Sequence, residues 1–157
     1  MPTIINKLSP KDNAALLKLH NYNFTSSQWK ITNWNRFFNS TEKPIFYAIK
    51  EGPGFAGFVM GKQTRKNTSV VLLNTLLVTQ AYRKNGYGKK LVTLFLQAAF
   101  RKPYIKKVLL HFREANKKNL LPFYTKLGFS NHCVHGSYKN GEAKHYLSMT
   151  RKRFKNL

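Results

Sequence analysis

The sequence predicts a mixed α/β fold in which helices flank a central sheet. The clearest sign is the segment 70–79, which is apolar like a buried strand and leads through a basic turn with two glycines into an amphipathic helix. Two hairpin patterns, around Gly52-Pro53-Gly54 and around Asn140-Gly141, each lie between segments of strand-like composition. Together these observations favour a mixed α/β sandwich.

The N-terminal part of the chain is expected to contain a short strand and two helices. The strand covers 3–8, and the helix over 10–20 that follows is capped by Ser9 and has proline and aspartate in its first turn. A second helix is expected over 29–38, where aromatic side chains share one face at helical spacing. These side chains are Trp34, Phe37 and Phe38.

Three strands and a third helix follow. The strands cover 44–50, 55–62 and 70–79, and the first two are joined by the hairpin connection 51–54. After a basic loop, apolar side chains recur on one helix face, which indicates packing on the sheet. These side chains are Tyr87, Leu91, Leu94, Phe95 and Ala98.

The C-terminal part is expected to add three strands and one helix. The strands cover 105–112, 129–135 and 143–150, and the turn at Asn140-Gly141 joins the last two. The helix covers 118–127, with Gly128 as a left-handed cap. Residues 151–157 are read as a basic tail.

The composition indicates a single domain over residues 1–157. Of the 157 residues, 42% are hydrophobic, which is enough for one core, and no Pro/Gly/Ser-rich stretch divides the chain. The long apolar run 70–78 is too short to cross a bilayer, and the N-terminus lacks a basic region followed by an apolar signal core. We therefore expect a cytoplasmic protein with no membrane partner.

Neither a disulfide framework nor a metal site is expected. The single cysteine, Cys133, leaves too few thiols for either, and a lone strand cysteine is usually a small buried apolar residue. His132 and His135 are three residues apart on an expected strand, so their side chains would point to opposite faces.

The charge balance is the second informative feature of the composition. The chain has 28 Lys and Arg against five Asp and Glu, a formal net charge of +23, and the basic residues are spread along its length. Such a field attracts polyanions, so RNA, a ribosome or an acidic protein surface would fit as a partner. A lysine-rich compositional bias is the alternative.

The most informative segment joins the central strand to the next helix. Glycines allow close backbone approach, and the start of a helix offers free N–H groups, so this loop is expected to bind a pyrophosphate; simple turn chemistry is the alternative. The segment comprises Leu76, Leu77, Val78, Arg83, Lys84, Asn85, Gly86, Tyr87, Gly88 and Lys89. It resembles the acetyl-CoA loop, Arg/Gln-x-x-Gly-x-Gly/Ala, of the GNAT N-acetyltransferase superfamily.

A second motif of that superfamily follows downstream. Residues 120–129 are similar to its Phe-Tyr-x-Lys-x-Gly-Phe helix end. The resemblance implies a mostly antiparallel sheet, splayed at the central strands, and acetyl-CoA as co-substrate. It also implies that the backbone of residues 76–78 binds the pantetheine arm, with the N–H of Val78 facing the thioester oxygen. The chain is most similar to the branch of ribosomal-protein alanine N-acetyltransferases.

The resemblance also implies catalytic roles. Tyr124 matches the tyrosine that gives a proton to the departing thiolate, although it would also suit core packing. His111 lies where the ribosomal-protein branch has a catalytic glutamate, five residues before Asn116, and an imidazole can accept a proton at neutral pH. A structural role for His111, deprotonation through water, and Glu114 as base if the strand extends that far are the alternatives.

Two asparagines are candidates for contact with the coenzyme. Asn116 matches an asparagine of the family, but this chain has one residue more than the usual pattern between it and Tyr124. Asn119 could take its place, and either could instead cap the helix that begins near Lys118. Cys133 is not expected as a nucleophile, because the family transfers the acetyl group directly.

Several functions remain open. The leading one is transfer of an acetyl group to a protein α-amine or lysine, with ribosomal protein as the favoured class of acceptor. Aminoacyl-tRNA and small amines are alternatives, but the positive charge would repel polycations unless Glu42, Glu51 and Glu142 gathered at the mouth of the site. A non-catalytic coenzyme-sensing or RNA-binding module is a further alternative. The protein is expected to be a monomer or homodimer.

Overall fold

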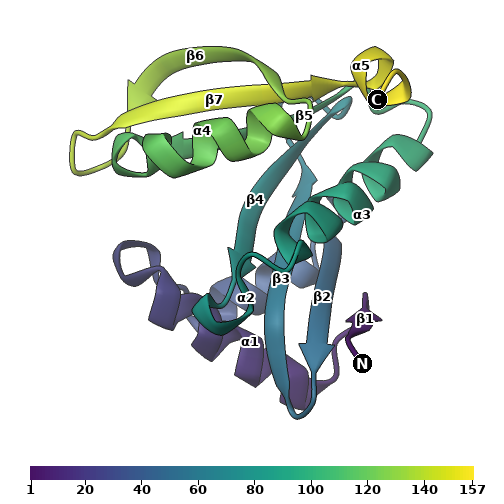
Figure 1. Cartoon of the computed structure of the whole chain (residues 1–157), viewed down its shortest axis with the longest axis vertical. Coiled ribbons are helices and arrows are strands. Elements are labelled where there is room, and N and C mark those ends of the chain that lie inside the picture. Colours follow the sequence, from purple (N-terminus) through teal and green to yellow (C-terminus); the bar gives the residue numbers. More distant parts are fainter. The chain divides into compact units, whose positions relative to one another are not determined.

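Seven strands and five α-helices make up the computed structural model, which describes residues 1–157 except for the side chain of Ser26 (Figure 1). The strands are β1 (Thr3–Ile5), β2 (Ile45–Glu51), β3 (Gly54–Gln63), β4 (Val70–Val78), β5 (Lys107–Arg113), β6 (Ser130–Ser137) and β7 (Ala143–Thr150). The helices are α1 (Pro10–Asn23), α2 (Ile31–Phe38), α3 (Tyr87–Arg101), α4 (Lys117–Lys126) and α5 (Arg151–Lys155), with 3-10 turns η1 (Thr25–Ser27), η2 (Gln80–Tyr82) and η3 (Glu114–Asn116).

The strands follow one another across a single sheet in the order β1-β2-β3-β4-β5-β7-β6. The β4–β5 pair is parallel, and the pairs β1–β2, β2–β3, β5–β7 and β6–β7 are antiparallel. The predicted mixed, mostly antiparallel α/β fold is therefore confirmed. By its internal contacts the chain forms two compact units: the first comprises Met1–Lys62 and Thr75–Phe95, and the second Gln63–Asn74 and Leu96–Leu157.

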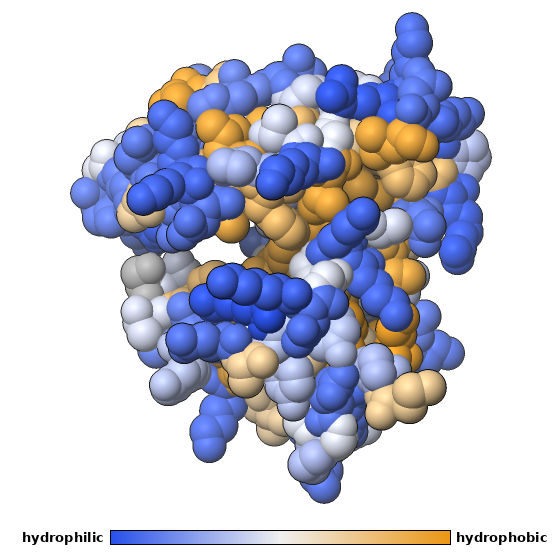
Figure 2. Space-filling view, in the orientation of Figure 1, coloured by the Kyte–Doolittle hydropathy of each residue, from blue (hydrophilic) through white to orange (hydrophobic). Residues whose placement is uncertain are grey.

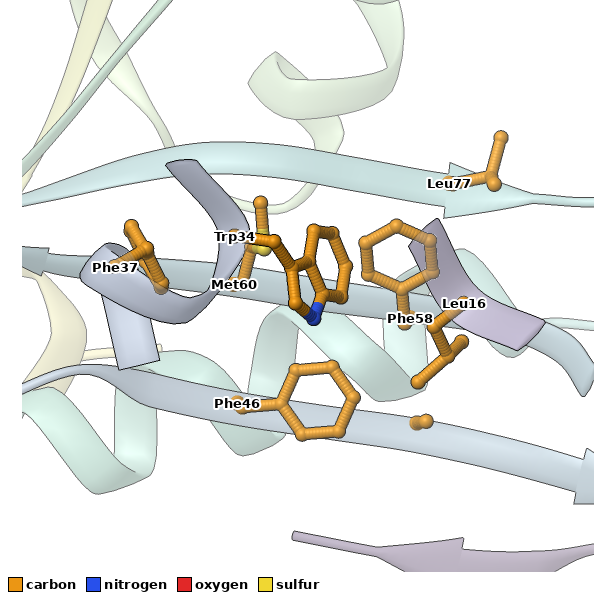
Figure 3. Packing of buried hydrophobic residues seen from close by; sticks show 8 residues of the cluster. Leu16, Trp34, Phe37, Phe46, Phe58, Met60 and Leu77 are labelled. Carbon is orange, nitrogen blue, oxygen red and sulfur yellow. The ribbon is translucent and has the colours of Figure 1, made fainter. Parts of the chain in front are cut away.

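The first unit is built around an aromatic core between its strands and the helices α1 and α2 (Figure 3). Trp34 is completely buried, and its indole N–H donates to the Oδ1 atom of Asn13 at 2.8 Å, so the polar end of the ring has a partner. Ser9 caps α1, as the sequence predicted, and the side chain of Asp12 completes a capping box with it. The buried members of this core are Leu16, Trp34, Phe37, Phe46, Ala48, Phe58, Met60 and Leu77.

Close backbone approach explains one glycine of β3. A Cβ atom added to Gly57 would overlap the carbonyl oxygen of Leu77 and come within 3.1 Å of the Cα atom of Val78. Only glycine lets these two segments lie so close together, which places the end of β4 directly beside β3. The glycine therefore supports the strand that leads into the basic loop.

The buried face of α3 differs from the predicted one. Leu91 and Phe95 are buried as expected, whereas Tyr87, Leu94 and Ala98 are only partly buried. The buried stripe instead also includes Val92, Leu96, Ala99 and Phe100. Because apolar side chains occupy more than half of the helix circumference here, periodicity alone did not determine which edge of the stripe faces inward.

In the second unit, β5 lies between the start of β4 and β7. Residues Val70–Leu72 pair in parallel with Lys107–Leu109, while all of β5 pairs with β7. Helix α4 ends at Lys126, and Gly128, two residues later, has a φ of +103°, the left-handed cap that the sequence predicted. A Cβ atom there would also lie 2.8 Å from Leu157 and 3.0 Å from Met149.

The predicted basic tail is folded. Its first residues form α5, and the guanidinium of Arg151 donates to the carbonyl oxygens of Phe100, Lys102 and Ile105. The ring of Phe154 stacks on that of Phe100 at 5.1 Å. The sequence could not predict these contacts, because the acceptors are backbone carbonyl oxygens at and just after the end of α3. Every residue has such a carbonyl, so no side-chain pattern marks them.

Two further observations concern exposure. Cys133 is exposed on β6, contrary to the expectation of a buried apolar residue, because most of that edge strand is open to solvent. Among the residues described, no helix has the length and apolar character needed to span a membrane. Hydrophilic residues cover most of the face drawn in Figure 2.

Candidate active site

The loop between β4 and α3 has the backbone geometry of an anion-binding site. Lys84 and Gly86 have positive φ angles of +65° and +77°, and α3 starts directly after them at Tyr87. The hydrogen bond from the N–H of Lys90 to the carbonyl of Gly86, 3.0 Å long, is the first of the helix, so the N–H groups before Lys90 have no acceptor within α3. Free amides at a positive helix end suit a phosphate.

The predicted loop residues surround this helix start in the first unit. Most residues of the loop are exposed, namely Arg83, Lys84, Asn85, Gly86 and Lys89, whereas Gly88 is partly buried. The Nε–H group of Arg83 donates to the carbonyl oxygen of Val78 at 3.1 Å, which fastens the loop to the end of β4. Leu77 is buried there, whereas Leu76 and Val78 are partly exposed. The structure thus keeps these residues in one continuous segment.

Tyr87 has a partner that sequence reasoning did not identify. Its hydroxyl donates to the carboxylate of Glu51, at the end of β2, and this hydrogen bond is the main cause that raises the pKa of Tyr87. The ring also lies 6.4 Å from that of Tyr82 in η2. Glu51 therefore holds the first residue of α3, a contact that no sequence spacing predicts across 36 positions.

None of the five carboxylates stands apart from a polar or charged group of this chain. Three carboxylates form ion pairs, in which a carboxylate oxygen lies near a side-chain nitrogen of the partner. The distances are 3.5 Å for Asp12–Lys50, 2.5 Å for Glu42–Lys62 and 3.3 Å for Glu142–Arg113. Glu51 accepts from Tyr87, and Glu114 contacts His145. The acidic side chains are thus used within the protein, which disfavours them as a binding surface for polycations.

His111 lies on β5 in the second unit, at the centre of a polar cluster. Its Nδ1 atom is 2.7 Å from the hydroxyl of Tyr138, and its ring lies 5.4 Å from that of Tyr146, its cross-strand neighbour on β7. Burial lowers the pKa of His111 below its ordinary value of 6.5, and the positive charges of Lys144 and Arg113 lower it further. The imidazole is therefore neutral at neutral pH and can accept a proton.

Glu114 does not fit the role of alternative base on the strand. Strand β5 ends at Arg113, and Glu114 belongs to η3, so its side chain does not continue the face of His111. Its carboxylate contacts the Nε2 atom of the buried His145, whose Nδ1 atom is 2.8 Å from the Nε2 atom of His132. The carboxylate and two rings join η3, β7 and β6, which is a structural role.

Tyr124 is buried in α4, with 5% of its surface exposed. Its ring packs edge-on against Phe123 at 5.0 Å and Phe129 at 5.5 Å. Burial raises the pKa of the phenol, so the group keeps its proton at neutral pH. Packing and proton donation, the two roles considered from the sequence, are both compatible with this environment.

The two asparagines lie at the start of α4. Asn116 occupies the N-cap position, but its side chain makes no capping hydrogen bond, so the capping role considered for it is not observed. Asn119 lies in the first turn of the helix, and both residues are exposed. A shallow cavity of about 420 Å³ is lined by Glu114, Ala115, Lys117, Lys118, Leu121 and Pro122.

Within the described residues, no group of three or more His, Cys, Asp or Glu side chains is arranged to hold a metal ion. His145 uses its two ring nitrogens toward different partners, Glu114 and His132. These three side chains therefore lie in a row and do not converge on one point, as metal ligands would.

The comparisons with known proteins include one family model whose range covers both the loop and the helix-end segment. The model of the Acetyltransferase (GNAT) family matches residues 13–129. No curated protein matches the chain in sequence.

Several solved structures share the fold. NAA60 of Arabidopsis thaliana in complex with acetyl-CoA superposes with a TM-score of 0.77 at 17% identity, covering 97% of this chain and 99% of that chain. The ribosomal-protein-S18-alanine N-acetyltransferase of Escherichia coli gives 0.75 at 18%, covering 96% and 94%. Spermidine/spermine N-acetyltransferase SpeG of Vibrio cholerae gives 0.74 at 16%, covering 99% and 95%.

Proposed function

Because this chain belongs to the GNAT acetyltransferase family and is an N-acetyltransferase, we propose that it transfers the acetyl group of acetyl-CoA directly to a primary amine of a protein. The acceptor proposed is an α-amine or a lysine side chain. The observation that carries this proposal is the basic loop at the start of α3, with its positive φ angles and amides that lack an acceptor within the helix.

On the coenzyme side, the loop is proposed to bind the pyrophosphate of acetyl-CoA. The backbone N–H groups of residues 86–89 would donate to its oxygens, and Arg83, Lys84 and Lys89 would supply positive charge. The backbone of residues 76–78 is proposed to hold the pantetheine arm, and Asn116 and Asn119 are proposed as additional contacts. The exposed loop and its left-handed residues support this assignment.

In the second unit, His111 is proposed as the base and Tyr124 as the acid. His111 would take a proton from the ammonium form of the acceptor, and the freed nitrogen lone pair would form the C–N bond as the C–S bond breaks. The phenol of Tyr124 would protonate the thiolate. The neutral state of His111 and the protonated state of Tyr124 at neutral pH support these roles.

A ribosomal protein is proposed as the acceptor, because the sequence resembles the branch of ribosomal-protein alanine N-acetyltransferases. By their names, the Escherichia coli enzyme compared above acts on ribosomal protein S18, and the Vibrio cholerae enzyme acts on spermidine and spermine. A polyamine acceptor is less favoured here because the net charge is +23 and each carboxylate already has a partner within the chain. The protein is further proposed to act in the cytoplasm as one domain, either monomeric or homodimeric.

A basic face of the second unit favours RNA as a second partner, either free, ribosomal or as aminoacyl-tRNA. Segments 63–69, 101–107 and 151–155 are joined by hydrogen bonds from Lys106 N–H to Ser69 at 2.8 Å and from Arg151 N–H to Lys106 at 2.9 Å. They contain ten of the 28 basic residues and none of the five acidic ones. The ten are Arg65, Lys66, Arg101, Lys102, Lys106, Lys107, Arg151, Lys152, Arg153 and Lys155.

The proposal is tested by thiol release from acetyl-CoA with ribosomal proteins, aminoacyl-tRNA and small amines as separate acceptor pools. Turnover with ribosomal proteins alone is the expected result. Turnover with aminoacyl-tRNA that falls steeply with increasing salt concentration would contradict a protein acceptor and show that the acceptor amine is carried by RNA. Tight coenzyme binding without turnover on any pool would favour a coenzyme-sensing module and contradict the proposed reaction.

The RNA proposal has its own matched test. Replacing Lys106, Lys152 and Lys155 by Gln should weaken RNA binding and reduce its dependence on salt, because fewer counterions are released. Replacing the exposed Lys7, Lys11 and Lys18 of the first unit removes the same charge from another surface. Equal losses in the two triple variants would show that only net charge matters and would refute the basic face.

A further inference from the structure

The hydroxyl of Tyr138 is the only described group within hydrogen-bond distance of His111 Nδ1, at 2.7 Å. Tyr138 follows β6, and His111 lies in the middle of β5, 27 residues earlier. No role for Tyr138 comes from the loop or from the helix-end motif.

The chemistry of the ring restricts the direction of this hydrogen bond. A neutral imidazole has one N–H and one lone pair, and only the nitrogen with the lone pair can act as a base. If Nδ1–H donates to the phenol oxygen, Nε2 has the lone pair. After Nε2 takes a proton both nitrogens are donors, so the phenol oxygen still accepts from Nδ1. Donation by Nδ1 is the arrangement that persists in both protonation states.

The surroundings hold the phenol in place. The guanidinium of Arg113 lies 4.0 Å from the centre of the Tyr138 ring, and the ammonium of Lys144 lies 5.1 Å from it. Such contacts orient the ring by cation–π attraction. The two cations are directly opposite each other on β5 and β7, a pairing of like charges that is unfavourable without a group between or beside them.

The turn that carries Tyr138 is also tied down. The N–H of Tyr138 donates to the carbonyl of Glu142 at 2.9 Å, and the N–H of Gly141 donates to the carbonyl of Tyr138 at 2.9 Å. The carboxylate of Glu142 accepts from the N–H of Ala115 at 2.8 Å and from Arg113 at 3.3 Å. The position of the phenol is thus fixed by backbone hydrogen bonds of the turn, by the ion pair between Glu142 and Arg113, and by the cations of Arg113 and Lys144 beside the ring.

We propose that Tyr138 is the positioning residue for His111: its oxygen accepts from Nδ1–H, fixes the ring orientation and leaves Nε2 as the basic atom. This inference rests on the proposed function of His111 as base. In the step it serves, the acceptor ammonium gives a proton to Nε2, the nitrogen lone pair forms the C–N bond with the acetyl carbon, and the C–S bond breaks. The amine loses two protons: the first passes from Nε2 to solvent, and the second leaves the nitrogen after the C–N bond has formed and replaces the proton that Tyr124 gives to the thiolate.

Charged and titratable groups from each neighbouring segment face this pair. Arg113 belongs to β5, Lys144 and Tyr146 belong to β7, and Glu142 and Tyr138 belong to the turn between β6 and β7. The cations disfavour a positive charge on the ring, so His111 returns its proton readily. The phenol fixes which nitrogen is basic, and the cations keep that nitrogen free of a proton between turnovers.

The test is the tautomer of His111, read by long-range proton–nitrogen correlation in ¹⁵N-labelled protein at neutral pH, with H111Q identifying its signals. Wild type should show Nδ1–H and an unprotonated Nε2. Y138F, which keeps the ring between its cations, should show loss of this preference. Y146F is the matched control, since Tyr146 contacts the His111 ring at 5.4 Å, and it should retain the wild-type tautomer. An Nε2–H tautomer in wild type, or an unchanged tautomer in Y138F, would overturn the inference.

Kinetics separates positioning from a structural role. Y138F should lower kcat about tenfold and move the ascending limb of its pH profile, while the Kd for acetyl-CoA stays unchanged. Unaltered kcat and pH profile would overturn the inference even if the tautomer changed. Absence of turnover in wild type with every acceptor pool would instead refute the proposed function, and the spectrum would still decide the hydrogen bond.

Discussion

Replacing Gly86 is the sharpest test of the coenzyme loop. Its φ is +77°, and an added Cβ atom would meet nothing within 4 Å, so the effect of Gly86→Ala comes from backbone conformation and not from a clash. The left-handed region costs a residue with a side chain about 1–2 kcal/mol. Because the loop is exposed, the free loop of the variant can relax to negative φ, and binding must then restore the strained form.

Strain of this size lowers affinity about 5- to 30-fold. A charge adds to it: two unit charges 4 Å apart interact by about 1 kcal/mol in bulk water. Gly86→Glu should therefore weaken acetyl-CoA binding by about 2–3 kcal/mol, which is about thirtyfold to 150-fold. Gly86→Lys has the same strain with an attractive charge, so it should bind more tightly than Gly86→Glu, and high salt should reduce the difference.

Isothermal titration with acetyl-CoA measures these affinities, and thermal unfolding measures the strain. Gly136→Ala is the matched control, because Gly136 has a φ of +69°, has equally open space and lies on β6 outside the loop. Its melting temperature should fall by about 2–8 °C with no change in affinity. If the Kd of Gly86→Glu equals that of Gly136→Ala, the loop does not bind the coenzyme.

Other variants test the remaining residues. Tyr124→Phe should leave the Kd for acetyl-CoA unchanged and lower turnover by about a hundredfold or more, measured by thiol release, because it removes only a proton donor; unchanged turnover would assign Tyr124 to packing alone. Lys144→Gln should raise the pKa of His111 and so move the midpoint of the ascending kcat limb to higher pH; an unmoved limb would show that another group is the base. Because the pKa of His111 is below 6.5 in the folded state, the unfolded chain binds more protons in that window, so the contribution of His111 to the free energy of unfolding should rise with pH up to about 6.5 and be lost on acidification. Burial lowers the pKa of His20 in the same direction, so H111Q should reduce this slope in urea titrations without abolishing it, and an unchanged slope would contradict the burial of a neutral His111. Gly57→Ala should cost about 1–3 kcal/mol in the same assay, because its Cβ atom would overlap the carbonyl oxygen of Leu77, and a smaller loss would show that the strands can separate there.

Local chemistry explains which elements could be predicted from the sequence. The Ser9 cap, the left-handed Gly128 and the turn at Asn140-Gly141 each depend on one or two residues whose backbone preferences are strong. The buried face of α3 was predicted less well, since its apolar stripe is too wide for periodicity to select the residues that face inward. The folded C-terminal helix depends on carbonyl oxygens around residues 100–105, which have no side-chain pattern.

The candidate site divides along the same line. The loop could be proposed from the sequence because close backbone approach and free amides require glycine and a helix start at fixed spacing, and these are visible in sequence. The hydrogen-bond partners of Tyr87 and His111 could not be predicted from the sequence. Glu51 reaches Tyr87 across 36 positions, and Tyr138 reaches His111 across 27. Glu114, considered as a base from its position after the strand, is instead bound to His145.

The sequence by itself determined the α/β class, the order of the elements and the family to which these motifs point, because each follows from residues close together in the chain. The proposed coenzyme loop is likewise a prediction from local sequence. Tertiary structure alone decided which groups surround them: the carboxylate that holds Tyr87, the cations beside His111 and the phenol at its Nδ1. The physical reason is that strand pairing and hairpin docking bring distant residues within hydrogen-bond distance. Protonation state and ring tautomer depend on those neighbours and not on the residue type alone.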